Sequence, residues 1–322
     1  MTLQASVVIC TYNRPTMLAA AVRSCLRDAT RRGAVFEVVI ADNSRDGHAA
    51  PLVAGLAAEG HPVRAVPASP PNISIARNAG LRAALAPLVA FLDDDLEVEP
   101  GWLDHFLDTM TATGADVAIG PVRPRFPGGA PAWDPYGTRF TRVLDQPTGA
   151  AIPVRAGAGS GFVVSTASSI WRAATCFADP APFDPGFGAS GGEDLDLFLR
   201  LAARGRRVVW CAEAGVRETI PASRTAGRYQ VLRAYSGAQV YTAAAVRHSA
   251  APRRRAAGIM ARGALQAALG AAVLPGAALL GLRGGTAATA RTMRALSLLA
   301  SGCGKLTWWR KVPLYHLEKA QP

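Results

Sequence analysis

Short apolar runs rich in β-branched residues alternate with helix-type patterns through the first 120 residues. The runs are SVVIC (6–10), VFEVVIA (35–41), VRAV (63–66), LVAFL (88–92) and DVAIG (116–120). They are almost continuously apolar, which is typical of strands buried on both faces of a parallel sheet. Between these runs, apolar residues recur at helical spacing. The first such stretch begins at Asn13 and Pro15 and reaches Leu26, and others lie at about 48–59, 74–86 and 100–112. This alternation predicts an α/β fold with an open, mostly parallel sheet flanked by helices.

Polar residues follow three of these runs directly. They are Thr11-Tyr12-Asn13 after the first strand, Asp42-Asn43-Ser44 after the second and Asp93-Asp94-Asp95 after the fourth. In an open α/β sheet, ligands bind beyond the carboxyl ends of the strands. The sequence therefore predicts a ligand site at this edge.

The three consecutive aspartates indicate a bound cation. Adjacent carboxylates repel by roughly 1–4 kcal/mol at effective dielectric constants between that of bulk water and that of a protein surface. A compact domain therefore needs a reason to keep them together. On an extended strand Asp93 and Asp95 point to one face and Asp94 to the other. We therefore expect Asp93 and Asp95 to converge on Mg²⁺ or Mn²⁺, which prefer oxygen ligands and take the remainder from substrate phosphates.

A dinucleotide-binding enzyme is disfavoured. That class needs G-x-G-x-x-G directly after the first strand, where this chain has TYNRP. The glycine-rich stretch RAGAGSGF (155–162) lies far downstream and leads into an apolar, strand-like run rather than a helix.

Five motifs in order resemble the inverting family 2 glycosyltransferases, which have the GT-A fold. They are TYNRP (11–15), ADNS (41–44), ISIARNAGL (73–81), FLDDD (91–95) and GGEDLDLFLRL (191–201). The resemblance covers roughly residues 5–235 and implies a nucleoside-diphosphate-sugar donor with Mn²⁺ or Mg²⁺ as cofactor.

The resemblance also implies roles for individual residues. The loop Thr11, Tyr12, Asn13 and Arg14 would line the nucleotide pocket. Asp42, with Asn43 beside it, would hydrogen-bond the base, and Arg77 would face the nucleotide. Asp95 matches the metal ligand, with Asp93 and Asp94 near the ribose and around the metal. Asp194 matches the catalytic base.

The chemistry agrees with these roles. The leaving diphosphate gains negative charge that a metal can stabilise, and one positioned carboxylate suffices to deprotonate an acceptor hydroxyl that attacks from the opposite face. Glu193 and Asp194 are both candidates, and spacing alone cannot separate them. Carboxylates at the start of a helix also offset its dipole without any catalytic role.

Other aromatic and basic residues receive weaker assignments. Trp102 and Trp171 are expected in the core, whereas Trp133 and Tyr136, in the Pro/Gly-rich loop 121–160, are candidates for stacking on an acceptor sugar. Residues 206–224 predict a last strand followed by a loop. Many relatives place a histidine there, but this chain has Arg217, Glu218 and Arg224. Arg224 and Arg228 are candidates for the pyrophosphate contact through charge-assisted hydrogen bonds.

The C-terminal hundred residues differ in charge from the rest. Ser223–Pro322 holds 15 Lys or Arg and one acidic residue, Glu318, which gives this segment a net charge of +14. The whole chain has a net charge of +12, so residues 1–222 together carry −2. This predicts a catalytic domain over 1–225 and a helical, membrane-associating region over 226–322. Nucleic acid is disfavoured as a partner, because no nucleic-acid motif accompanies the charge.

An uncharged stretch of twenty residues, 263–282, lies inside this basic region. It is long enough to span a bilayer, but Pro275 should interrupt the helix, and basic residues flank both ends. A helical hairpin in or dipping into an anionic cytoplasmic leaflet satisfies both flanks. Trp308 and Trp309 beside Arg310 suit the headgroup region. The alternative is a helical cap on the catalytic domain.

The sequence as a whole therefore predicts an inverting, metal-dependent glycosyltransferase at the cytoplasmic face of the cell membrane. Its acceptor would be a saccharide or lipid-linked saccharide, in polysaccharide or glycolipid synthesis. Five widely spaced cysteines and an N-terminus without signal-peptide features favour a reducing, cytoplasmic setting. The alternatives are a sugar nucleotidyltransferase, whose basic glycine-rich loop is missing, and a non-catalytic membrane-bound module that binds nucleotide sugars.

Overall fold

The computed structural model describes residues 2–28, 33–154, 164–282 and 285–313. The stretch RAGAGSGF (155–162) lies outside the described residues. The chain forms two compact units. The first comprises Met1–Arg123, Arg142–Gly188 and Glu193–Thr219, and the second comprises Pro124–Thr141, Ala189–Gly192 and Ile220–Pro322.

The units divide the chain differently from the boundary expected at residue 225. The division falls between Thr219 and Ile220, and residues 124–141, expected in the first domain, belong to the second unit. Backbone and side-chain bonds within the second unit explain this. Ile220 N donates to Arg125 O at 2.9 Å, and Trp133 Nε1 donates to Thr225 O at 3.0 Å.

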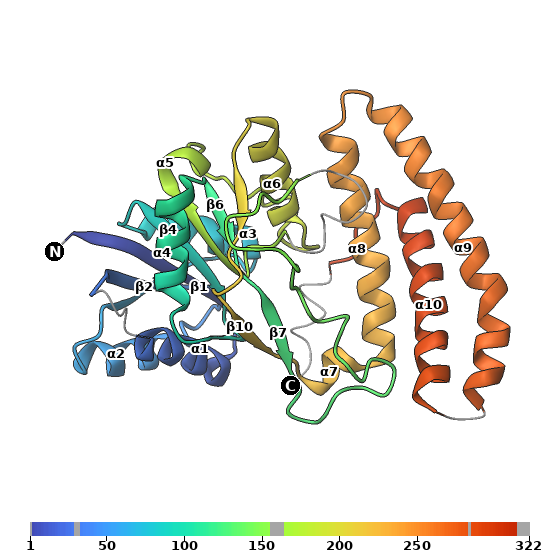
Figure 1. Cartoon of the computed structure of the whole chain (residues 1–322), viewed down its shortest axis with the longest axis horizontal. Helices are drawn as coiled ribbons and strands as arrows, with labels where there is room; N and C mark the ends of the chain where they lie inside the picture. The colour runs from blue at the N-terminus through green and yellow to red at the C-terminus, as the bar shows by residue number, and fades with distance from the viewer. Residues whose placement is uncertain (1, 29–32, 155–163, 283–284, 314–322) are drawn as a thin grey trace. The chain divides into compact units, whose positions relative to one another are not determined.

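A seven-stranded sheet forms the centre of the first unit (Figure 1). Its strands, in spatial order, are β3 (Val63–Pro67), β2 (Val35–Asp42), β1 (Leu3–Thr11), β4 (Leu88–Asp93), β8 (Ser168–Arg172), β6 (Val117–Ile119) and β9 (Val208–Trp210). β8 runs antiparallel to both its neighbours, and the other pairings are parallel. The predicted mostly parallel sheet is confirmed.

The strand order reverses at β1. The chain builds β2 and β3 on one side of β1 and then returns to add β4 on its other side. Such a switch point opens a crevice at the carboxyl ends of the two central strands. Thr11 is paired with Asp42, and Cys10 with Asp93, so the polar residues after β1, β2 and β4 share this edge.

In the described part of the first unit the chain forms six helices. They are α1 (Pro15–Arg27), α2 (Ala50–Ala58), α3 (Ile73–Ala83), α4 (Trp102–Thr113), α5 (Ala173–Cys176) and α6 (Glu193–Ala203). The start of α1 follows the sequence signal, with Pro15 in the first turn. Asn72 caps α3, since its side chain accepts hydrogen bonds from Ser74 N and Ile75 N.

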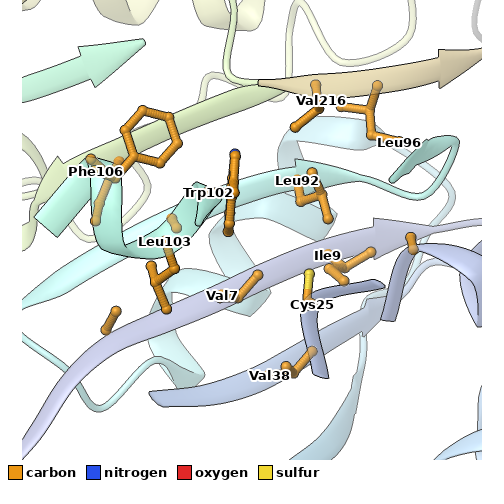
Figure 2. Close-up of a cluster of buried hydrophobic side chains, with 14 of the residues drawn as sticks. Val7, Ile9, Cys25, Val38, Leu92, Leu96, Trp102, Leu103, Phe106 and Val216 are labelled. Atoms are coloured by element: carbon orange, nitrogen blue, oxygen red, sulfur yellow. The ribbon is translucent and has the colours of Figure 1, made fainter. Parts of the chain in front are cut away.

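Alternate residues of the central strands feed two separate cores. Val7 and Ile9 of β1 pack with Leu18 of α1 and with Trp102 and Phe106 of α4 on one face (Figure 2). On the other face, Val8 and Cys10 pack in the cluster that contains Ala76 of α3, Phe198 of α6 and Trp171. Because both faces are covered, the strands are apolar throughout. Trp102 and Trp171 are buried, as expected.

The segment 206–224 differs from its prediction of one strand and a loop. After β9 the chain forms a further strand, β10 (Val216–Thr219), and the short helix α7 (Ala222–Thr225). β10 lies between β5 (Leu96–Val98) and β7 (Val122–Arg125) in a three-stranded sheet and pairs antiparallel with β5. These strands of three and four residues give too little pattern for detection from sequence.

Three long helices dominate the second unit: α8 (Gly227–Arg247), α9 (Pro252–Leu282) and α10 (Thr286–Leu306) (Figure 1). The expectation that Pro275 interrupts the helix is wrong, because α9 continues through it. A proline removes one main-chain hydrogen bond, and the other turns of this helix retain theirs. The hairpin is formed by α9 with α10, not within 263–282.

Candidate active site

The loop after β1 is joined to the aspartates after β4. Thr11 Oγ1 donates to Asp94 Oδ2 at 2.8 Å. The Nη1 atom of Arg14 lies 3.1 Å from Asp94 Oδ1 and 3.5 Å from Asp95 Oδ2. Tyr12 is half-buried and Asn13 is exposed, with a left-handed φ of 53°. The loop thus turns Arg14 back onto two carboxylates.

The expected extended geometry of residues 93–95 is wrong. β4 ends at Asp93, and Asp94 and Asp95 form a tight turn into β5. The backbone carbonyl of Asp95 accepts a hydrogen bond from Thr219 N at 2.9 Å, next to the paired β5 and β10. Consequently Asp94 and Asp95 share Arg14, whereas Asp93 faces a different cation.

That cation is Arg77, which is 5 % exposed on α3. Its guanidinium forms a short ion pair with Glu193 Oε1 and lies 3.6 Å from Asp93 Oδ1. Its Cζ lies 5.5 Å from the centroid of the Phe183 ring. Burial lowers the pKa of Arg77, but Glu193 and Asp93 outweigh burial, so the guanidinium stays charged. Arg77 therefore links the end of β4 to the start of α6.

Glu193 and Asp194 differ in environment although they are adjacent. Glu193 is 5 % exposed, and its Oε2 accepts no hydrogen bond from the described residues. Burial raises the pKa of Glu193 to about 7 despite Arg77. Asp194 is half-buried, and its Oδ1 accepts a hydrogen bond from Leu195 N at 2.8 Å. Asp194 is thus the more accessible of the two carboxylates.

Asp42 and Asn43 are buried and engaged within their own loop. Asp42 Oδ1 accepts from Ser44 N and Oγ, and Oδ2 accepts from Ala49 N before α2. Burial raises the pKa of Asp42, but these hydrogen bonds outweigh it, and the pKa is lowered. Asn43 Nδ2 donates to Ala68 O and Pro70 O. The expected contact of Asp42 with a nucleotide base remains a prediction.

Two residues that sequence reasoning missed lie beside the site, His48 and Arg142. His48 connects two of its parts: Nδ1 lies 3.1 Å from Asp42 Oδ1, and Nε2 lies 3.3 Å from Thr11 Oγ1. Its place shortly after the second strand was an available signal. Arg142 Nη2 donates to Glu218 Oε2 at 3.1 Å, and both affect the pKa of Asp93. No motif marks Arg142, which the pairing with Val122 positions.

The remaining candidates belong to the second unit. Trp133 packs on Phe140, with ring centroids 5.9 Å apart, and Tyr136 is 88 % exposed. Arg224 lies on α7, and Arg228 is exposed at the start of α8. Their acceptor and pyrophosphate roles remain predictions. Arg217 lies on β10, where its Nε is 3.1 Å from Glu99 Oε1.

The carboxylate oxygens after β4 are donor atoms of the type that Mg²⁺ and Mn²⁺ prefer. Burial raises the pKa of Asp94 to about 6; Arg14 opposes this effect, and the neighbouring Asp95 and Asp93 add to it. Across the described ranges, no group of three or more His, Cys, Asp or Glu side chains is arranged to hold a metal. Mg²⁺ is commonly held by one or two carboxylates plus substrate phosphates, and the expected coordination by Asp93 and Asp95 remains a prediction.

Comparisons with known proteins agree with this fold. A family model described as "Glycosyl transferase family 2" matches residues 6–171. The succinoglycan biosynthesis protein ExoM of Rhizobium meliloti (strain 1021) is 33 % identical over 241 residues, which is 74 % of each chain. The glycosyltransferase AglE of Haloferax volcanii is 28 % identical over 142 residues, 43 % of this chain and 45 % of that protein.

A solved structure shares the fold. The crystal structure of S. aureus TarS 1–349 in complex with UDP aligns with a TM-score of 0.53 at 16 % identity, over 92 % of this chain and 90 % of that chain. The family model covers half of the sequence and includes the residues after β1, β2 and β4. This chain therefore belongs to glycosyltransferase family 2 and is a transferase with the GT-A fold.

Proposed function

We propose that the protein is an inverting glycosyltransferase that moves a sugar from a nucleoside-diphosphate sugar to a hydroxyl of a saccharide or lipid-linked saccharide. The observation that carries the proposal is the joined cluster of Asp93, Asp94, Asp95, Arg14 and Arg77 at the switch point between β1 and β4. The UDP bound by TarS, a protein of the same fold, supports a nucleoside-diphosphate donor.

Asp93 and Asp95 would hold Mg²⁺ or Mn²⁺ together with donor phosphates. When bound, such a cation offsets the negative charge that develops on the leaving diphosphate. Arg14 keeps Asp94 and Asp95 in position through its Nη1 atom. Thr11 fixes the orientation of Asp94 through its hydroxyl.

Asp194 would remove the proton from the acceptor hydroxyl. It is more accessible than Glu193, and its carboxylate stands at the first turn of α6. Glu193 would serve as a positioning residue, because Arg77 holds its Oε1. A single carboxylate base is sufficient for attack with inversion.

Two observations of different kinds support the proposed biological setting. ExoM is a protein of succinoglycan biosynthesis, and this supports polysaccharide assembly. Among the described residues, one helix, over Pro252–Leu279, is long and apolar enough to cross a membrane by length and composition. We place the protein at the cytoplasmic face of the membrane, where a lipid-linked acceptor is available.

Turnover of three variants tests the proposal. Nucleoside diphosphate release from UDP-, dTDP-, GDP- and CDP-sugar donors, with native membranes as the acceptor source, identifies the donor. Asp194→Asn should lower turnover about 10²–10⁴-fold, the usual contribution of a general base, and Asp95→Asn should reduce it comparably. Asp108→Asn on α4, outside the cluster, is the matched control and should leave turnover unchanged.

The outcomes separate the possible roles. Product of inverted anomeric configuration in NMR supports inversion, and retained configuration rules it out. If Glu193→Gln abolished turnover while Asp194→Asn kept most of it, Glu193 would be the base. A folded protein that binds nucleotide without any turnover would be a non-catalytic binding module.

A further inference from the structure

Helix α9 exposes a series of apolar side chains on one side. Leu265, Leu269, Val273 and Leu279 are 60, 48, 56 and 63 % exposed. Their spacings of four and six residues place them on one broad face of a helix. Within the most apolar window of this helix only 17 % of residues are buried. Such a contiguous exposed patch normally marks an interaction site; it is called the α9 outer face below.

The other side of α9 is occupied by α10, which lies between α8 and α9 in Figure 1. Glycines bring the two backbones close together. A Cβ on Gly270 would collide with the backbone of Leu299, and one on Gly302 would collide with the backbone of Ala267. Lys305 Nζ donates to Gln266 Oε1 at 2.7 Å. The glycine contacts and the outer face are therefore on opposite sides of the helix.

The charge of this region determines what can cover the outer face. Arg253, Arg254 and Arg262 are exposed before it on the same helix, and Arg291 and Arg294 are exposed on α10. Residues 223–313 contain no Asp or Glu. A second copy of this chain would bring like charges together, and nucleic acid offers no aliphatic phase that could bury the leucines. An anionic phospholipid leaflet matches both properties.

The packing of α10 decides between lying on the membrane and crossing it. The uncharged part of α10 between Arg294 and Lys305 is ten residues, about 15 Å of helix at 1.5 Å per residue. The hydrocarbon core is about 30 Å thick. If α9 crossed the core with α10 packed along it, arginine or lysine of α10 would enter hydrocarbon. A helix in the plane of the interface avoids that.

We propose that α9 lies in the plane of an anionic leaflet, with its outer face among the acyl chains and its arginines at the phosphate groups. This deepens the membrane location within the proposed function by naming the surface and its mode of binding. The surface contains none of the carboxylate cluster, so its failure and that of the catalytic proposal are distinguishable.

Vesicle flotation of the full chain tests this proposal. The protein should float with vesicles of phosphatidylcholine and phosphatidylglycerol in equal parts. Leu265→Gln/Leu269→Gln should lower the partition coefficient at least about tenfold, since two leucines leave the acyl region. Leu85→Gln, at a leucine 74 % exposed in the first unit, is the matched control and should bind normally.

Charge variants test the attraction between the arginines and the anionic lipid. Arg253→Gln/Arg254→Gln should weaken binding to the anionic vesicles roughly fivefold per arginine. The same double variant should bind vesicles of phosphatidylcholine alone as well as the unaltered protein does. Added salt should weaken binding of the unaltered protein to anionic vesicles, because it screens surface charge.

Other results would overturn the proposal. Absence of binding to anionic vesicles, or unchanged binding of the leucine variant, would rule out the α9 outer face as the membrane-binding surface. Resistance of the bound protein to alkaline carbonate indicates a spanning helix. A concentration-dependent dimer that the leucine variant abolishes indicates a second copy. A nucleotide-dependent rise in the unfolding temperature that persists in the leucine variant shows that its folded donor site is intact.

Discussion

At the scale of single residues, Arg77 is buried against two carboxylates. Its guanidinium contacts Asp93 and Glu193, and the contact with the nucleotide that the ARN motif implies remains a prediction. Removing one member of a buried ion pair leaves an uncompensated charge, which is far more costly than removing both. Arg77 therefore supports the fold as well as the site.

Arg77→Met should lower the free energy of unfolding by about 3–5 kcal/mol, because Glu193 and Asp93 lose their buried counter-ion. Arg77→Met/Glu193→Met should lose less than the single variant. Urea unfolding measures both, with Arg23→Met on the exposed side of α1 as the control. Equal losses for the single and double variants would contradict the buried-pair interpretation.

At the scale of elements, a glycine on α3 sets the distance between that helix and β1. A Cβ at Gly80 would collide with Val8 Cγ1, whereas one at Gly55 on α2 would meet nothing within 4 Å. Both are helical glycines. The same substitution is therefore expected to have opposite effects on stability at the two positions.

Gly80→Ala should destabilise the protein by about 1–3 kcal/mol through overpacking. Gly55→Ala should stabilise it by about 0.5–1 kcal/mol, since alanine loses less conformational freedom in a helix. Thermal and urea unfolding give both values. Because Gly80 lies one turn after Arg77, a crystal structure of Gly80→Ala that showed an unmoved α3 would contradict this account.

Glu37 joins three strands and the loop after α3. Its carboxylate accepts hydrogen bonds from Ser6 Oγ and Leu85 N, and from Arg64 Nε and Nη2 at 3.0 and 2.9 Å. Burial raises the pKa of Glu37, but these bonds outweigh it, and the pKa is lowered from its ordinary value of 4.5. The folded state thus favours the ionised carboxylate more than the unfolded state does.

This has a defined pH dependence. The stabilisation by Glu37 is complete above its unfolded pKa and is lost as pH falls through the lower folded pKa. Glu37→Gln should lower stability at neutral pH by about 1–3 kcal/mol and should flatten its fall below pH 4.5. Exposed Glu59→Gln is the control in acid unfolding curves, and an unchanged acid slope in Glu37→Gln would refute the assignment.

The sequence predicted elements whose pattern is local and missed those that depend on partners. The five expected strands and α1, α3, α4 and α6 were evident from apolar runs and helical spacing. The expected burial is wrong for β3, which is an edge strand with only Val63 buried. The antiparallel direction of β8 and the turn at Asp94–Asp95 follow from pairing with distant strands. Likewise, the motifs named Asp93 and Arg77, but only tertiary packing brings Arg142 beside Glu218.

At the scale of the whole molecule, a donor nucleotide and a cation should act together. A ligand at a hundred times its Kd stabilises the folded state by about 2.7 kcal/mol, which raises the unfolding midpoint of a large domain by roughly 5–10 °C. We expect UDP, dTDP, GDP or CDP to produce this rise with Mn²⁺ and to lose it on chelation.

Thermal unfolding with each nucleotide, with and without Mn²⁺, measures the effect. Asp95→Asn should abolish the metal-dependent part, and Asp108→Asn should keep it. A rise of the same size in the presence of a chelator would show that the nucleotide binds without a cation, and Asp93 and Asp95 would then need another role.

The pairing of carboxylates with arginines also sets a charge balance. Arg14 and Arg77 together contact four carboxylates, those of Asp93, Asp94, Asp95 and Glu193. Burial raises the pKa of Asp94 to about 6 and that of Glu193 to about 7, so full ionisation is reached only above neutral pH. Two negative charges are then left over, which one divalent cation would neutralise. Electroneutrality therefore favours Ca²⁺ as much as Mg²⁺ or Mn²⁺. Discrimination between these ions would have to come from coordination number and ionic radius.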